Sequence, residues 1–263
     1  IRDRIKTMPV FSRMVLHDYE VICPRLNLAD TKGLYCGEPD VMHCQQCLAM
    51  YPSNYQVFDI VRWRDEHQRL LNAVNEVCVP SHDVALRLTR YFATLDVYVQ
   101  AHDDLDSHYH PVTPHLNADE KLRVIVIGAI SKLKGFDVLI ACAKQAKQMG
   151  YPIEFVLLGY SLNDTLAQRV GIEVIGKYHE EQALEKLLAI QGHLVFLPSL
   201  WPETYSYTLS LALSAQLRVA AFDIGAIAQR LKVLNADEWL MDLSWSQSPE
   251  KIIQYFEKFR QNC

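Results

Sequence analysis

The stretch Leu122-Arg123-Val124-Ile125-Val126-Ile127-Gly128-Ala129-Ile130 is an apolar run with the length of one β-strand. A helical pattern follows over 136–149, and Gly150 stands where it can cap that helix. A strand that is apolar on both faces and leads into a helix is typical of a parallel sheet with helices on both sides. This stretch therefore predicts a doubly wound α/β fold.

The same alternation continues to the end of the chain. We predict further strands over 153–159, 172–176, 194–197 and 219–222. Helical patterns occupy 180–190, 207–217 and 226–234, and an amphipathic helix over 249–259 closes the sequence. We therefore expect the second half of the chain to form a doubly wound lobe.

The first hundred residues follow the same logic less completely. Their pattern predicts short strands over 14–16, 77–79 and 97–99, a helix over 53–76, and a second helix from its cap Ser81 to Tyr91. A doubly wound lobe normally opens with its own strand and phosphate loop, and neither is visible before Met14. We therefore expect an incomplete N-terminal lobe over 1–103, a linker over 104–119, a second lobe over 120–248 and a C-terminal helix over 249–263.

The composition of the 263 residues is that of an ordinary globular protein, with 50% hydrophobic and 22% charged residues. A net charge of −5 gives no support to a nucleic-acid partner. The apolar runs are too short to span a bilayer, and no signal segment is visible at the start. We therefore expect a cytoplasmic location and no transmembrane segment, with peripheral contact at the inner face of a membrane left open.

The loop after the first long strand carries Gly128, Lys132 and Lys134 and opens onto a helix. Ligands of doubly wound sheets bind at the carboxyl ends of the strands. A helix start with a nearby ammonium group is a favourable place for a diphosphate. A solvated loop without a ligand is an equally good interpretation of these residues alone.

A second loop is more specific. The stretch Pro198-Ser199-Leu200-Trp201-Pro202-Glu203-Thr204-Tyr205-Ser206-Tyr207-Thr208 leads from a strand into a helix, with a glutamate in the turn. Phe222-Asp223-Ile224-Gly225-Ala226 follows the next strand. Here the chain resembles the family-4-type retaining glycosyltransferases (glycosyl transferases group 1). These enzymes have the GT-B architecture, in which two Rossmann-like lobes face each other. Shorter matches in the first lobe are His17-Asp18-Tyr19, Cys23-Pro24-Arg25 and Pro80-Ser81.

The resemblance implies roles for these residues. Lys134 matches the lysine that neutralises the donor diphosphate, and Glu203 matches the first glutamate of an E-x7-E motif, which contacts the transferred sugar. His17 and Asp18 fall where the acceptor-side lobe presents a residue to the reacting centre, although a strand-end hydrogen-bonding pair is the alternative. The backbone amides expected to bind the sugar and diphosphate belong to Tyr205, Ser206, Tyr207 and Thr208.

Two positions depart from the family pattern. The second glutamate of the motif, which holds the nucleotide ribose, is replaced by Leu211. The arginine after the glycine of the first loop is replaced by Ala129, and Lys132 supplies only a point charge in its place. These departures favour weak donor binding.

The function that the resemblance implies is transfer of a sugar from a nucleoside-diphosphate donor to a hydroxyl acceptor on a glycan, lipid or polysaccharide precursor. It implies a hexosyl-type transfer with retention of configuration and without a catalytic metal. The alternative is a catalytically impaired, glycosyltransferase-like binding or scaffold protein. A nicotinamide-dependent oxidoreductase is disfavoured, because no G-x-G-x-x-G follows a strand.

Four cysteines lie within 25 positions in the first lobe, with the spacing C-x12-C-x7-C-x2-C. Four thiolates with one C-x2-C pair suit tetrahedral zinc, and His43 is a substitute for one of them. The alternative is a set of reduced cysteines without a metal. The spacing favours a structural zinc held by Cys23, Cys36, Cys44 and Cys47.

Overall fold

The computed structural model describes residues 10–30, 32–51, 53, 55–103, 108–112, 114–117 and 119–263. These residues form two compact units. Unit 1 falls within Ile1–His102 and also includes Trp201–Tyr205, and unit 2 comprises Asp103–Leu200 and Ser206–Cys263. The second half of the sequence therefore contributes one short segment to the first unit.

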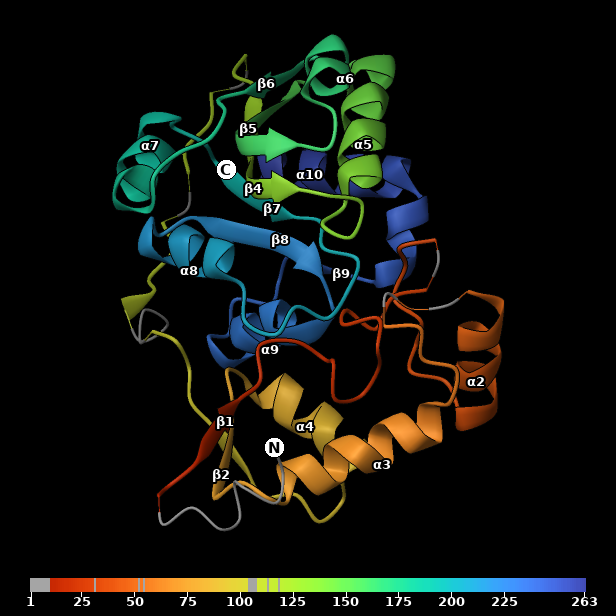
Figure 1. Ribbon diagram of the computed structural model, residues 1–263. Helices are drawn as coiled ribbons and strands as arrows, with labels where there is room; N and C mark the ends of the chain where they lie inside the picture. The colour runs from red at the N-terminus through yellow and green to blue at the C-terminus, as the bar shows by residue number, and fades with distance from the viewer. Residues whose placement is uncertain are drawn as a thin grey trace. The chain divides into compact units, whose positions relative to one another are not determined.

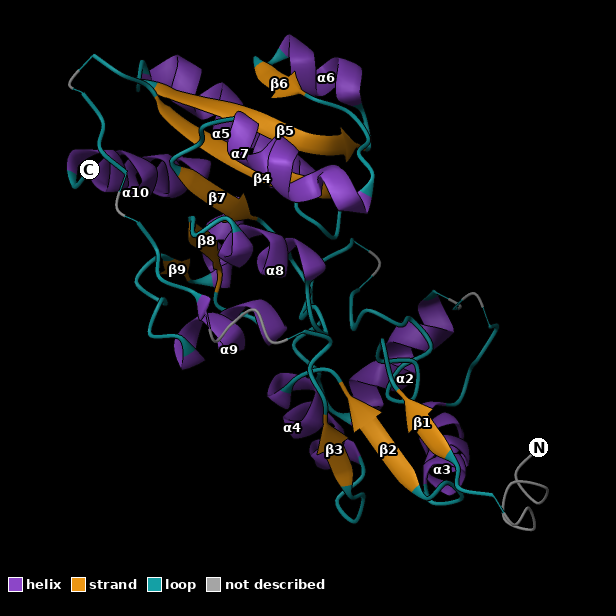
Figure 2. Ribbon diagram, turned by 90° about the vertical axis from the view of Figure 1, so that its left-hand side faces the viewer, coloured by secondary structure: helices purple, strands orange, loops and turns teal. Residues whose placement is uncertain are grey.

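Unit 2 contains a parallel six-stranded sheet with the order β6-β5-β4-β7-β8-β9 (Figure 2). This is the strand order of a Rossmann fold, with the topological switch point between β4 and β7. The doubly wound α/β fold class predicted from the sequence is confirmed. The strands are β4 (Leu122–Ile130), β5 (Ile153–Ser161), β6 (Ile172–Val174), β7 (Leu194–Leu197), β8 (Arg218–Phe222) and β9 (Leu240–Met241).

Helices cover both faces of this sheet (Figure 1). Ile125 and Ile127 of β4 are buried in one cluster with Leu187 and Leu209 from the helices of one face. On the other face the ring of Phe256 lies 6.4 Å from that of Phe155 of β5. The helices are α5 (Phe136–Met149), α6 (Asp164–Arg169), α7 (Ala183–Ala189), α8 (Tyr207–Ser214), α9 (Gly225–Val233) and α10 (Pro249–Gln261), with 3-10 turns η2 (Glu180–Gln182) and η3 (Leu243–Gln247).

Unit 1 is built on a smaller parallel sheet with the order β1-β2-β3. Its core contains the buried side chains of Tyr19, Val79, Leu88 and Phe92. Ser81 caps the helix after β2 as predicted, and its hydroxyl accepts a hydrogen bond from the amide of Val84. The elements are β1 (Arg13–Val15), α2 (Val41–Met50), α3 (Ile60–Leu71), β2 (Glu76–Val79), α4 (His82–Tyr91) and β3 (Val97–Val99).

One prediction for this unit was wrong, and one helix was not predicted. The helix expected over 53–76 is α3, which begins at Ile60 because the carboxylate of Asp59 caps it, and which ends at Leu71. The hydroxyl of Ser53 instead accepts a hydrogen bond from the amide of Val57, in a turn before the helix. The helix that was not predicted is α2, which begins after its cap Asp40 in the stretch that contains the cysteines.

The helices of unit 2 follow the predicted pattern with shorter ends. The helix expected over 207–217 ends at Ser214, and the one expected over 180–190 begins as the 3-10 turn η2. Gly150 closes α5 in the left-handed conformation, as predicted. Among the described residues, none of the helices has both the length and the apolar character needed to cross a bilayer.

Candidate functional site

In unit 2, the loop after β4 meets the start of α8. Gly128 has a φ of +111°, and a Cβ atom built on it would lie 3.2 Å from Cγ2 of Thr208. Gly128 lies near the end of β4 and Thr208 in the first turn of α8, on the two sides of the switch point. The structure thus brings together two of the predicted donor-site residues at the edge where such sheets bind ligands.

A second contact joins the same loop to the segment after β7. The amide of Leu200 donates a hydrogen bond to the carbonyl of Leu133 at 2.8 Å. Gly135, with a φ of +82°, packs so closely on Pro198 that any side chain there would overlap the proline carbonyl. Lys132 and Lys134 lie on this loop, which the contacts with Leu200 and Pro198 fix in position. Within the loop, the amide of Lys134 donates a hydrogen bond to the hydroxyl of Ser131.

The start of α8 is organised by Ser206. Its backbone adopts a positive φ of +79°, and its hydroxyl accepts a hydrogen bond from the amide of Leu209 and lies 3.1 Å from Oγ1 of Thr208. Ser206 is buried, whereas the side chain of Tyr207 is exposed. A strained non-glycine residue at a helix start is a feature found at functional sites, where surrounding structure holds it in place.

Arg230 of α9 supports this helix start. Its guanidinium is buried and donates hydrogen bonds to the carbonyl of Ser206 at 3.3 Å and to the hydroxyl of Ser210 at 2.9 Å. A carboxylate oxygen of Asp103 lies 3.7 Å from the same guanidinium. A buried charge needs such polar partners. Two of them, the carbonyl of Ser206 and the hydroxyl of Ser210, belong to the start of α8, so Arg230 stabilises this helix start. The sequence analysis missed Arg230, although its position within the apolar face of a predicted helix was a signal.

The two departures from the family pattern also lie in unit 2. Leu211 is half-buried on α8 and packs against the hydrophobic cluster under that helix. Ala129 is exposed, next to Gly128 in β4. Neither residue offers a hydrogen-bonding side chain to a ligand.

In unit 1, the segment Trp201–Tyr205 packs against the residues after β1. The hydroxyl of Thr204 donates a hydrogen bond to the carbonyl of His17 at 2.8 Å. The ring of His102 stacks on that of His17, with centroids 5.6 Å apart, and meets the ring of Tyr205 edge-on at 4.7 Å. The structure therefore groups two predicted site residues, His17 and Tyr205, through two residues that the sequence analysis did not select, Thr204 and His102.

The other predicted residues of this unit differ in their surroundings. The carboxylate of Asp18 accepts a hydrogen bond from the amide of Glu20 at 2.8 Å, which closes a local turn. Glu203 is buried, and its amide donates to the carbonyl of Trp201. Trp201 meets the ring of Tyr19 edge-on. Burial raises the pKa of Tyr19 well above its ordinary value, so this phenol stays neutral and donates to Asp83.

The structure does not support the predicted zinc site. Within the part of the chain that the structure describes, which includes Cys23, Cys36, Cys44 and Cys47, no group of three or more histidine, cysteine or acidic residues is arranged to hold a metal ion. Burial raises the pKa of Cys23 to about 11, which favours the protonated thiol. Cys44 lies on α2, where its sulfur is 3.5 Å from the guanidinium of Arg64 and 3.6 Å from the carbonyl of Pro39.

Comparisons with known proteins identify the class of fold. No model of a known protein family matches the sequence, and no curated protein matches it. Solved structures do match, and among them are glycosyltransferases of the GT-B architecture. The chain therefore has the Rossmann-like fold of GT-B glycosyltransferases, and the predicted resemblance is confirmed at the level of the fold.

Three of the similar structures define the extent of this likeness. TarM matches 98% of this chain with 14% identity and a TM-score of 0.58, and the chain covers 48% of TarM. The lipopolysaccharide outer core galactosyltransferase WaaB matches 85% of the chain with 10% identity and a TM-score of 0.53, and 65% of WaaB is covered. The N-terminal domain of trehalose-6-phosphate phosphatase from Candida albicans matches 99% with 10% identity and a TM-score of 0.55, with 68% of that domain covered. The chain thus spans about half the length of TarM.

Proposed function

We propose that this chain acts in glycosyl transfer from a nucleoside-diphosphate sugar to a hydroxyl acceptor. The observation that carries the proposal is the close approach of Gly128, near the end of β4, to Thr208 at the start of α8, where a Cβ atom built on Gly128 would lie 3.2 Å from Cγ2 of Thr208. Glycine at this position lets the end of β4 and the start of α8 come close together, at the sheet edge where ligands of doubly wound folds bind. The proposed donor site is the surface formed there by unit 2.

The donor diphosphate is bound in this proposal by Lys132, Lys134 and the backbone amides at the start of α8. The first amides of a helix have no partner within the helix, and the helix dipole favours an anion beside them. Charge builds up on the leaving diphosphate as the sugar is transferred. Stabilising that charge with fixed donors is the main catalytic contribution that these residues offer.

Unit 1 supplies the remaining roles. We assign Glu203 to the transferred sugar, and His17 with Asp18 to the acceptor side of the reacting centre. The packing of Tyr205 and His102 beside His17 supports this assignment, because it fixes the position of the histidine. The proposed reaction is a hexosyl-type transfer that retains the anomeric configuration. Its acceptor is a glycan, lipid or polysaccharide precursor, met in the cytoplasm or at the inner face of a membrane.

Nucleotide binding tests the donor site directly. Calorimetric titration with UDP, GDP and dTDP should give binding of one of them, and Lys134→Ala should weaken it about tenfold or more, because a charge-assisted contact to the diphosphate is lost. Lys144→Ala is the matched control, since Lys144 is an exposed lysine on α5. Equal affinity in both variants would remove Lys134 from the site.

A second candidate function is ligand binding without catalysis. The observation in its favour is Leu211, which packs against the hydrophobic cluster in place of a ribose-binding carboxylate. Sugar transfer measured with Glu203→Gln separates the two functions. If the chain is an enzyme, this variant loses turnover while its melting temperature stays close to that of the parent. Nucleotide binding without any transfer in the parent protein would favour the second function.

A further inference from the structure

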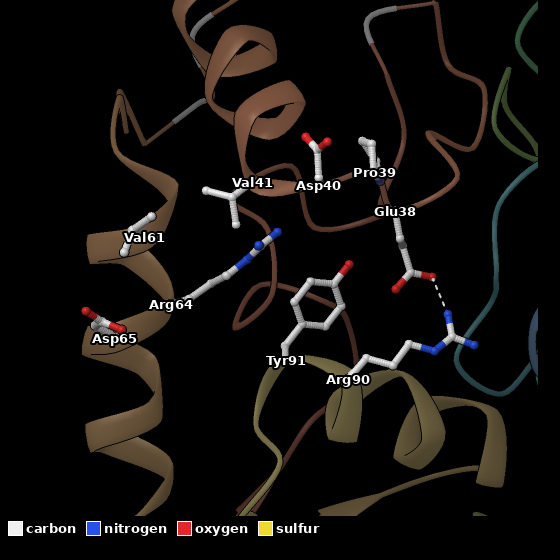
Figure 3. A pocket seen from close by; sticks show the side chains of 9 residues that line it. All are labelled: Glu38, Pro39, Asp40, Val41, Val61, Arg64, Asp65, Arg90 and Tyr91. Carbon is white, nitrogen blue, oxygen red and sulfur yellow. Dashed lines mark ion pairs between the residues drawn. The ribbon is translucent and has the colours of Figure 1, made fainter.

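The helix α3 of unit 1 presents different side chains on its two sides. Val61 and Arg64 line the pocket between α2, α3 and the end of α4 (Figure 3). Trp63 and His67 lie four positions apart, so they share one side of the helix, and neither of them lines that pocket. The side of α3 that carries these two rings is the one considered below.

Three rings form an aromatic cluster there. The ring of Tyr55 lies 5.6 Å from that of Trp63, with an interplanar angle of 32°, and the ring of His67 lies 4.4 Å from Trp63 on the helix. Nε1 of Trp63 donates a hydrogen bond to the carbonyl of Glu20 at 2.7 Å, and Nδ1 of His67 donates one to the carbonyl of Trp63 at 2.8 Å. Tyr55 is 49% exposed. The cluster therefore offers solvent one aromatic ring that packs on a hydrogen-bonded base.

Two carboxylates lie beside the exposed ring. The charge of Glu20 is the main cause of a raised pKa of Tyr55, and the charge of Asp18 adds to it. Both acidic residues belong to the turn after β1, which also carries His17. The charges that act on this phenol are thus both negative, and a ligand that stacks on Tyr55 meets carboxylate oxygens as hydrogen-bond acceptors.

An aromatic face beside carboxylates suits a sugar ring. Such a ring has an apolar face of C–H groups, which stacks on an aromatic side chain, and hydroxyl groups, which donate strong hydrogen bonds to carboxylates. Tyrosine also supplies a large contact area at a low cost in conformational entropy, because it has only two side-chain torsions.

The same groups disfavour two other kinds of ligand. A sugar phosphate or a uronic acid would bring a negative charge toward Asp18 and Glu20, and like charges repel across an interface. A quaternary ammonium group is recognised by aromatic rings that surround it. The rings of Tyr55 and Trp63 are inclined by only 32°, so they do not enclose a cation. The surface therefore fits a saccharide without anionic groups.

We propose that Tyr55, Glu20 and Asp18 bind the acceptor of the proposed reaction, and that this acceptor is a saccharide without anionic groups. The sugar ring stacks on Tyr55, and its hydroxyls donate to the two carboxylates. That the ligand is the acceptor rests on the proposed function, in which His17 and Asp18 face the acceptor. The binding itself is measurable without a nucleotide, because all of these residues belong to unit 1.

Ligand-observed NMR tests the proposal on the whole chain, without any nucleotide. Saturation-transfer spectra are recorded with cellobiose, maltose and N-acetylglucosamine, with the anionic sugars glucose 6-phosphate and glucuronic acid, and with choline. We expect transfer to at least one uncharged sugar and none to the anionic sugars. Tyr55→Ala should weaken that binding at least about tenfold, because the stacking surface is lost. Tyr98→Ala is the matched control, since Tyr98 is an exposed tyrosine on β3 of the same unit.

Two further variants separate the ring from the charge. Tyr55→Phe keeps the ring and should retain most of the saccharide binding. Glu20→Gln removes one negative charge, so it should bind glucose 6-phosphate more tightly relative to the uncharged sugar than the parent does. A purely structural role of Glu20 would not change this preference. Thermal unfolding of each variant shows that it is folded.

The outcomes distinguish this site from the proposed function. Saccharide binding that Tyr55→Ala weakens, without any sugar transfer by the parent, would contradict the proposed function and support the saccharide site. Nucleotide binding without saccharide binding would overturn the saccharide site alone. Equal binding by Tyr55→Ala and Tyr98→Ala, equal transfer to the anionic sugars, or transfer to choline in place of the sugars would also overturn it.

Discussion

The hydroxyl of Thr204 donates a hydrogen bond to the backbone carbonyl of His17, although 187 positions separate the two residues. Thr204 is buried, and it follows the proposed sugar-binding residue Glu203. This bond ties the segment that carries Glu203 to the segment that carries His17, so both proposed catalytic residues share one support.

Replacing Thr204 by valine removes this hydrogen bond and keeps the shape of the side chain. We expect Thr204→Val to lower the free energy of unfolding by about 1–2 kcal/mol, because the carbonyl of His17 loses a buried donor. Thr204→Ser, which keeps the hydroxyl, should lose less. Urea unfolding of both variants is the measurement, and a larger loss in the serine variant would contradict the role of the hydroxyl.

Gly128→Ala should damage the proposed donor site. At a φ of +111° with Thr208 close by, an alanine costs about 1–3 kcal/mol and displaces the start of α8. Gly150→Ala is the control, because Gly150 also has a positive φ but has no neighbour within 4 Å of a built Cβ. Both variants should be less stable by thermal unfolding. Only Gly128→Ala should lose nucleotide affinity, and equal affinities would argue against a ligand at this loop.

Leu211→Glu restores the carboxylate of the family pattern. Because Leu211 packs against the hydrophobic cluster of unit 2, we expect the glutamate to lower the free energy of unfolding by about 1–3 kcal/mol. Leu211→Met, which preserves the apolar contact, is the control. Calorimetry with UDP and GDP is run beside the unfolding measurements. An increase in affinity of about tenfold would instead identify a ribose site that this chain has lost.

His193 makes the stability of unit 2 depend on pH. Its Nδ1 accepts a hydrogen bond from the amide of Arg123 at 2.9 Å, and burial lowers its pKa below the ordinary value. The unfolded chain therefore binds more protons than the folded one as the pH falls through about 6.5, and stability decreases there.

The test compares the parent protein with His193→Asn, which offers an acceptor but does not titrate. Urea unfolding is measured at about pH 7.5 and about pH 5.5, on the two sides of the ordinary histidine value. The parent should lose more stability on acidification than the variant. The same loss in both proteins would assign the pH dependence to other groups.

The strands of unit 2 were predictable because few secondary structures other than a buried strand suit their apolar composition. A run such as Val124 to Ile127 buries both faces, and only the interior of a covered parallel sheet accommodates that. The start of α3 was less predictable, because Ser53 and Asp59 are both suitable helix caps. The helix uses Asp59, and no local pattern distinguishes the two. The helix α2 was missed because its cysteines and glutamines form no clear apolar period.

The candidate site was predictable only in part. Gly128 lies near the end of β4 and Ser206 lies in the segment after β7, so the rule that ligands bind at strand ends selects both. Arg230 and Thr204 were missed because their importance comes from partners distant in the sequence, Ser210 and His17.

The segment Trp201–Tyr205 belongs to unit 1 although unit 2 surrounds it in the sequence. This has a consequence for how the chain folds during its synthesis on the ribosome. The edge-on contact of Trp201 with Tyr19 and the bond from Thr204 to His17 need residues that are synthesised only after β4, β5, β6 and β7. Domains that are continuous in sequence can fold as soon as they emerge, in order from the N-terminus. Here the first unit stays incomplete until most of the second has been translated, so the nascent chain exposes the surface around Tyr19 for much of its synthesis.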